Sequence, residues 1–196
     1  GETAYCIDIN TDFKNGYNAY GVCGIYSAPG TAVKEAYDTS GIVTNDRGVT
    51  VWLKGNRVSR NQIMAIKEES VTEQKNSLAV CLDNILRHAG ITRNTEYDLA
   101  QGKTATTILS ENMTGVQVLD LSGCTLDAVL YYVNQDIPVL AILDDGEAVL
   151  VTGFNEFNVV IMEPSTGKLY KKGMNDATAW FAENGNHFIT YMRTEN

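Results

Sequence analysis

Cysteine and histidine are the residues of this chain that could carry nucleophilic chemistry. A thiolate attacks a carbonyl carbon when a nearby imidazole takes the thiol proton, so both residue types are needed close together. The sequence has four cysteines and two histidines. Cys124 follows Gly123 at the expected start of a helix, where unpaired amides lower a thiol pKa, and His187 begins an expected strand. Cys81 is the other candidate partner of His187.

Each of these residues also has a purely structural interpretation. Cys81 falls on the apolar stripe of its helix and is therefore expected to be a core thiol. His88 lies two turns further along the same helix, about 10 Å from Cys81 at 1.5 Å per residue, too far for a hydrogen bond. We favour Cys124 as an ordinary helix cap and His187 as a strand-edge histidine. Both thiol candidates stay open at this point.

The cysteine spacing does not predict a metal site. No C-x-x-C pair occurs and histidines are scarce, so we expect no metal and no cofactor. Asp144, Asp145 and Glu147 gather at a predicted hairpin, and we interpret them as a solvated turn rather than a cation site. Cys6 and Cys23 lie in two short apolar runs; they are either two buried thiols, which we favour, or a disulfide.

The first third of the chain is predicted to form a small β-rich domain over residues 1–66. Its predicted elements are strands over 3–9 and 20–26, a helix over 29–38, and a hairpin of 42–44 with 49–53. The order β-β-α-β-β predicts a small sheet or partly open barrel with one helix. The polar stretch 67–76 carries few apolar residues and is the predicted linker.

Residues 77–196 change to helices followed by strands. Ser77 is the predicted N-cap of a helix through Ala89, with Gly90 as its stop. The other predicted helices cover 104–113, 125–135 and about 175–183, the second of them capped by Cys124 or Thr125. The predicted strands cover 138–143, 148–153, 159–162 and 187–192. Helices that precede an antiparallel sheet indicate an α+β fold.

Four motifs of this second part resemble the papain-like cysteine peptidase domain of bacteriocin-processing enzymes. Ser77–Gly90 is similar to the family's nucleophile helix, which reads Cys-Gly-Pro-Ala and ends at a glycine. Glu147–Gly153 is similar to its His-x-x-x-x-x-Gly strand, and Glu163–Gly167 to its Asp-Pro-x-x-Gly segment, at the expected interval of sixteen residues. Asp136–Val139 is similar to its Gly-x-Pro-Val. The resemblance covers about 120 of 196 residues and implies a papain-like fold after a small β-rich domain.

Every chemical position of that family pattern is replaced. Ser77 stands where the resemblance implies the cysteine, Glu147 where it implies the histidine, and Glu163 where it implies the aspartate. Val71 stands where a glutamine of the oxyanion hole is implied, and Gln74 is only three residues before Ser77. A serine without a base stays protonated, and a carboxylate with an ordinary pKa of about 4 is a poor base for it. No catalytic residue is therefore expected.

Three functions follow from these observations. The leading hypothesis is an inactive peptidase homologue that keeps the family's cleft to bind a peptide or protein. The first alternative is an active cysteine hydrolase that uses Cys81 or Cys124 with His187. The second is a purely structural domain of a larger surface protein.

The composition excludes several classes of partner. Asp and Glu number 24 against 15 Lys and Arg, which gives a net charge of -9 and a pI of about 4.7, so neither nucleic acid nor an anionic membrane surface is an expected partner. No apolar run approaches the roughly 20 residues of a membrane span. The family resemblance implies a bacterial, secreted or cell-surface protein; no signal peptide is present, and Gly1 is interpreted as a cleavage scar. The oligomeric state is not predicted.

Overall fold

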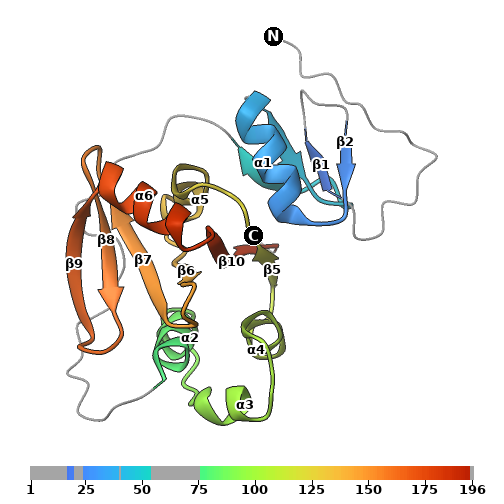
Figure 1. Cartoon of the computed structure of the whole chain (residues 1–196). Coiled ribbons are helices and arrows are strands. Elements are labelled where there is room, and N and C mark those ends of the chain that lie inside the picture. Colours follow the sequence, from blue (N-terminus) through green and yellow to red (C-terminus); the bar gives the residue numbers. More distant parts are fainter. Residues whose placement is uncertain (1–16, 20–23, 40, 54–75, 195–196) are drawn as a thin grey trace.

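A computed structural model describes residues 17–19, 24–39, 41–53 and 76–194 (Figure 1). We call the described residues up to 53 the N-terminal unit and residues 76–194 the C-terminal unit. The predicted strand 3–9, nearly all of the predicted linker, Cys6, Cys23, Val71 and Gln74 lie outside the described residues. The predicted domain boundaries therefore stay a prediction.

The N-terminal unit contains a four-stranded antiparallel sheet in the order β2-β1-β3-β4 and one helix. Its elements are β1 (Tyr17–Ala19), β2 (Gly24–Tyr26), α1 (Pro29–Thr39), β3 (Ile42–Thr44) and β4 (Thr50–Leu53). The order β-β-α-β-β is present, although β1 lies in the stretch predicted as a connection. Ala32, Val33 and Ala36 of α1 are fully buried, as their helical spacing predicted.

The C-terminal unit is built on a six-stranded antiparallel sheet in the order β5-β10-β6-β7-β8-β9. Its strands are β5 (Val116–Asp120), β6 (Val139–Ile142), β7 (Ala148–Phe154), β8 (Asn158–Glu163), β9 (Lys168–Gly173) and β10 (His187–Arg193). Its helices are α2 (Ser77–His88), α3 (Glu96–Ala100), α4 (Ala105–Asn112), α5 (Leu126–Val133) and α6 (Met174–Glu183). The predicted α+β class is confirmed.

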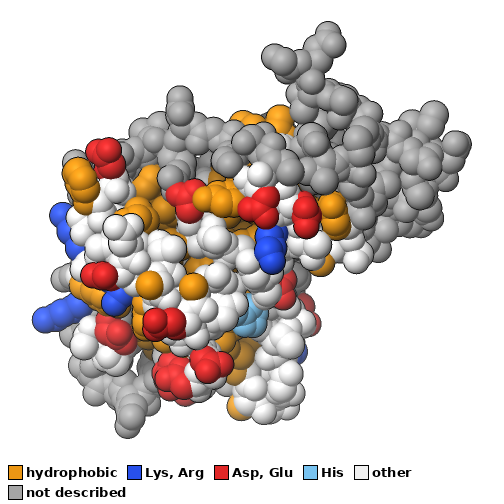
Figure 2. Space-filling model, turned by 45° about the horizontal axis from the view of Figure 1, so that its top comes forward, with side chains coloured by type: hydrophobic (Ala, Val, Ile, Leu, Met, Phe, Trp, Pro, Cys, Tyr) orange, Lys and Arg blue, Asp and Glu red, His pale blue; other side chains and the backbone are white. Residues whose placement is uncertain are grey.

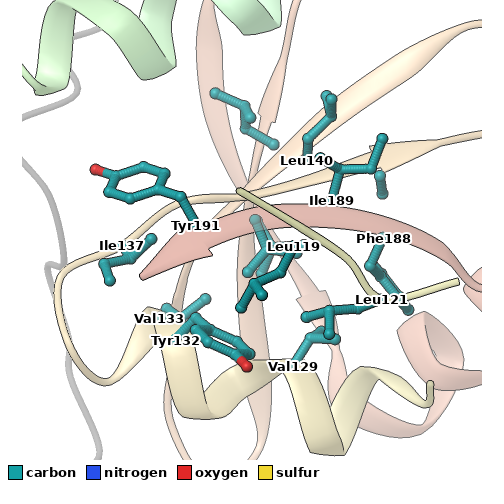
Figure 3. Close-up of a cluster of buried hydrophobic side chains, with 14 of the residues drawn as sticks. Leu119, Leu121, Val129, Tyr132, Val133, Ile137, Leu140, Phe188, Ile189 and Tyr191 are labelled. Atoms are coloured by element: carbon teal, nitrogen blue, oxygen red, sulfur yellow. The ribbon is translucent and has the colours of Figure 1, made fainter. Parts of the chain in front are cut away.

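Helices cover both faces of this sheet. All seven residues of β7 are buried, which requires cover on both sides of the strand. Both α2 and α5 contact β6 and β7. Figure 3 shows α5 on one side of the strands, near Leu119 and Leu121, and the green helix on the other side, toward which Leu140 and Ile189 point. The layers are therefore α2, sheet and α5.

Three elements of the C-terminal unit have no counterpart among the predicted ones. Both edge strands are among them, because β5 and β9 are only partly buried and lack a clear apolar alternation. Lys168, Lys171 and Lys172 lie on β9, and lysines on an edge strand are typical of protection against pairing with another chain. The third is the five-residue α3. Within the described residues, no helix is long and apolar enough to span a bilayer.

The hydroxyl group of Tyr191 is buried and has no hydrogen-bond partner among the described residues. An unpaired buried polar group costs about 1–3 kcal/mol. We therefore expect Tyr191→Phe to leave the free energy of unfolding unchanged or to raise it, by up to about 2 kcal/mol. Urea unfolding followed by circular dichroism measures this difference.

Tyr132 provides the matched control for that substitution. Its hydroxyl group is also buried, but it donates a hydrogen bond to the Val51 carbonyl oxygen at 2.7 Å. Tyr132→Phe should therefore lower the free energy of unfolding by about 1–2 kcal/mol. Equal losses in Tyr132→Phe and Tyr191→Phe would contradict the interpretation of Tyr191.

Candidate functional site

The start of α2 differs by one residue from the prediction. Asn76 is the N-cap, and its Oδ1 accepts hydrogen bonds from the backbone N–H groups of Leu78 at 2.9 Å and Ala79 at 3.3 Å. The prediction of Ser77 as N-cap is wrong, because Asn76 is an equally strong capping residue and takes that position. Ser77 is the first residue of the helix, so its hydroxyl group does not cap the helix and can bind a group outside it.

The Ser77 side chain joins α2 to the sheet. Its Oγ accepts a hydrogen bond from the backbone N–H of Ala148 at 2.9 Å. Ala148 is the first residue of β7, and Glu147 directly precedes it. Residues 77 and 147, which are far apart in the sequence, are therefore neighbours in space.

Glu163, the last residue of β8, lies close to this point. Leu150 pairs with Met162, which brings Glu163 beside Val149, two residues along the strand from Glu147. The two acidic residues therefore lie near each other, where β7 begins and β8 ends.

Cys81 belongs to the same arrangement. It lies one turn after Ser77 in α2. Burial raises the pKa of its thiol well above the usual value, and the negative charges of Glu163 and Glu147 raise it further. The structure thus gathers Ser77, Cys81, Glu147 and Glu163, and we call these four residues the α2–β7 site.

Both acidic residues of the α2–β7 site belong to tight turns. The Glu163 carboxylate accepts hydrogen bonds from the backbone N–H of Ser165 at 3.3 Å and from its hydroxyl group at 3.0 Å. The backbone N–H of Glu147 donates to Asp145 Oδ1 at 2.9 Å, while the Glu147 side chain is exposed. Within the described residues, no group of three His, Cys, Asp or Glu could hold a metal ion.

Tyr170 of β9 borders the α2–β7 site and was missed by the sequence-based reasoning. Ile161 pairs with Tyr170 and Glu163 with Lys168, so Tyr170 and Glu163 are diagonal neighbours on one face of the sheet. Burial raises the pKa of the Tyr170 hydroxyl group, and the charge of Glu163 raises it further. The ring is 37% exposed. Alternation of apolar and charged residues over 168–172 was the available signal, but it is short and rich in lysine.

Neither candidate thiol has the environment of a nucleophile. Cys81 is fully buried in the core. Cys124 is 1% exposed, and its Sγ donates a hydrogen bond to the Gly30 carbonyl oxygen at 3.3 Å. Burial raises the pKa of Cys124 to about 12, although it lies just before Thr125, the N-cap of α5. Both thiols are therefore protonated at neutral pH, and only the thiolate is a nucleophile.

The two histidines of the sequence bind other partners. His88 Nε2 lies 2.9 Å from the Asp136 carbonyl oxygen. His187 Nε2 lies 4.0 Å from Asp120 Oδ1 on the neighbouring strand. Within the described part of the chain, neither imidazole is hydrogen-bonded to Ser77, Cys81 or Cys124.

Comparison with known proteins identifies the fold. No protein-family model matches the chain, and no curated protein does. A solved structure described as a C39-like peptidase from Bacillus anthracis superposes with a TM-score of 0.56, over 70% of this chain and 100% of that chain. The fold is papain-like. Since sequence identity is 12%, the similarity shows the fold alone. The papain-like fold expected from the four motifs is thus confirmed.

Proposed function

We propose that this chain is a non-catalytic papain-like module that binds a peptide or protein segment at the α2–β7 site. The observation that carries the proposal is the hydrogen bond from the Ala148 N–H to Ser77 Oγ. It joins the position where the family resemblance implies the nucleophile to the residue directly after the one where it implies the base. Those two family positions hold a serine and a glutamate in place of the thiol and the imidazole on which that chemistry depends.

The charge of the site favours a basic ligand. Glu147 and Glu163 place two acidic residues near the start of α2, and Tyr170 adds a partly exposed aromatic ring. Lysine and arginine side chains are attracted to carboxylates and to aromatic faces. The net charge of -9 acts in the same direction at low salt, and acidic side chains are spread over the face shown in Figure 2. A peptide that carries Lys or Arg is therefore the probe of choice.

The first test separates a binding module from an enzyme. We expect no cleavage of unfolded casein or of a fluorogenic peptide panel at neutral pH. A thiol-reactive peptide probe should label neither Cys81 nor Cys124, because burial raises both thiol pKa values. Peptide mapping by mass spectrometry measures the labelling of each cysteine separately. Cleavage that disappears in Cys81→Ala or Cys124→Ala would instead establish the alternative, an active cysteine hydrolase.

The second test measures binding itself. Three fluorescein-labelled peptides of equal length and positive, zero or negative charge are titrated, and fluorescence anisotropy reports the dissociation constants. The basic peptide should bind most tightly, and Glu147→Lys should weaken it by about tenfold or more, the equivalent of about 1.4 kcal/mol. Glu156→Lys makes the same charge change at an exposed turn at the other end of β7 and should have little effect. Equal effects of the two substitutions, or no binding at all, would favour a structural domain.

A further inference from the structure

Helix α5 is buried on two opposite faces. Leu126, Val129, Leu130 and Val133 form the stripe that the sequence predicted to face inward, and all four are fully buried. Ala128 and Tyr132 are also buried, at 2% and 0% exposure, and lie one turn apart on the other side of the helix. A helix that is buried on two opposite faces needs a second partner.

Strand β4 of the N-terminal unit covers this second face. The indole Nε1 of Trp52 donates a hydrogen bond to the Ala128 carbonyl oxygen at 2.9 Å. The hydroxyl group of Tyr132 donates to the Val51 carbonyl oxygen at 2.7 Å. Trp52 is itself 2% exposed and packs against Tyr131 with ring centroids 6.4 Å apart. The contact therefore combines apolar burial with paired polar groups.

Helix α1 docks along the same region, from its first turn to its third. A Cβ atom built at Gly30 would lie 2.8 Å from the Ser122 carbonyl oxygen, so the two backbones are in close contact there. Cys124 Sγ donates to the Gly30 carbonyl oxygen. At the other end of the helix, the Tyr37 hydroxyl group donates to Asp127 Oδ2 at 2.9 Å.

A third contact involves the turn between β3 and β4. Asn45 is 5% exposed, and its Nδ2 donates to Gln117 Oε1 of β5 at 3.0 Å. The contacts between the two units thus involve α1, the β3–β4 turn and β4 on one side, and β5, the loop that follows it and α5 on the other. Contacts spread over so many elements fix both position and orientation.

We infer that the N-terminal unit is a permanent brace of α5, docked on the face of β6 and β7 opposite α2. Helices α2 and α5 lie on opposite faces of β6 and β7 (Figure 3). Among the described residues, the contacts between the two units given above involve none of Ser77, Glu147 and Glu163. This is not the placement of an inhibitory segment that blocks a binding site. The inference concerns docking alone and does not depend on the proposed function.

The brace can be tested through Cys124, which α1 covers. The full chain is exposed to a small maleimide under native conditions, and peptide mapping measures the labelling rate of each cysteine. In the wild type, Cys124 and Cys81 should both be protected. Gly30→Ala should accelerate labelling of Cys124 by about tenfold or more, because the added methyl group meets backbone atoms of residues 120–122, while Cys81 stays protected. Thr31→Ala, an exposed neighbour in the same helical turn, is the matched control.

Tyr132→Phe provides a milder second variant in case Gly30→Ala unfolds the whole chain and exposes Cys81 too. It removes one hydrogen bond of the interface and adds no atom, and it should accelerate labelling of Cys124 more than labelling of Cys81. Rapid labelling of Cys124 in the wild type would overturn the inference. So would rates in both variants that equal the rate in Thr31→Ala.

Discussion

Trp52→Ala is expected to lower the free energy of unfolding by about 3–5 kcal/mol, the usual cost of removing a large buried aromatic side chain. The indole is 2% exposed and its N–H is paired with the Ala128 carbonyl oxygen. Its ring also lies 6.2 Å from that of Tyr37, centroid to centroid. The substitution therefore removes packing within the N-terminal unit and between the two units at once.

The measurement is urea unfolding read by the fluorescence of Trp180. The sequence has two tryptophans, so in Trp52→Ala the remaining signal comes from α6 of the C-terminal unit. We expect the Trp180 transition to move to lower urea, because the brace stabilises the C-terminal unit. Leu53→Ala, at the adjacent and 42% exposed position, should change stability by no more than about 0.5 kcal/mol. A Trp180 transition that stays at its wild-type midpoint would show that the units unfold independently.

The second large effect is expected from rebuilding part of a thiol–imidazole pair. Ser77→Cys places a thiol at the first residue of α2, where the Ala148 N–H points toward it and the carboxylates of Glu147 and Glu163 oppose its ionisation. Adding Glu147→His replaces one negative charge by an imidazole, and a protonated imidazole lowers a neighbouring thiol pKa. At pH 6, iodoacetamide should alkylate Cys at position 77 about 10- to 100-fold faster in the double variant, since a pKa lower by one to two units raises the thiolate fraction by that factor.

The direction of the change in thiol pKa can be measured from the pH dependence of the alkylation rate. For Ser77→Cys alone, the rate should fall as the pH drops below the thiol pKa, which is about 8.5 for a free cysteine. In the double variant, the protonated imidazole lowers the thiol pKa, so the alkylation rate should begin to fall only at a lower pH. Ser77→Cys combined with Glu156→His is the control, because it introduces the same imidazole at a distant turn. Identical pH profiles for the two double variants would mean that residues 77 and 147 do not face each other.

Local patterns allowed much of the C-terminal unit to be predicted. The apolar stripe of α2 and the turn residues around Asp145–Gly146 are local signals, and they placed the helix and the β6–β7 hairpin within a few residues. The relation among Ser77, Glu147 and Glu163 came from ordered motifs instead. No periodicity would have brought residues from α2, β7 and β8 together.

Two features could not be predicted because their partners are far away in the sequence. Cys124 has the local features of a reactive thiol at a helix start. No residue near it in the sequence indicates that its Sγ is buried against the Gly30 carbonyl oxygen. The second apolar face of α5, with Ala128 and Tyr132, was visible as a pattern but had no predicted partner. The N-cap of α2 was missed for a smaller reason, because Asn76 and Ser77 are both good capping residues and only one can occupy the position.

The brace also has a consequence for how the chain folds. The hydrogen bonds that hold it join residues between 72 and 94 positions apart. During synthesis, Trp52 and α1 leave the ribosome well before α5 exists to cover them, so a nascent chain carries an uncovered aromatic surface for that interval. Contacts so distant also slow the folding step in which they form. The N-terminal unit is made first, yet its docking contacts can form only once α5 is available.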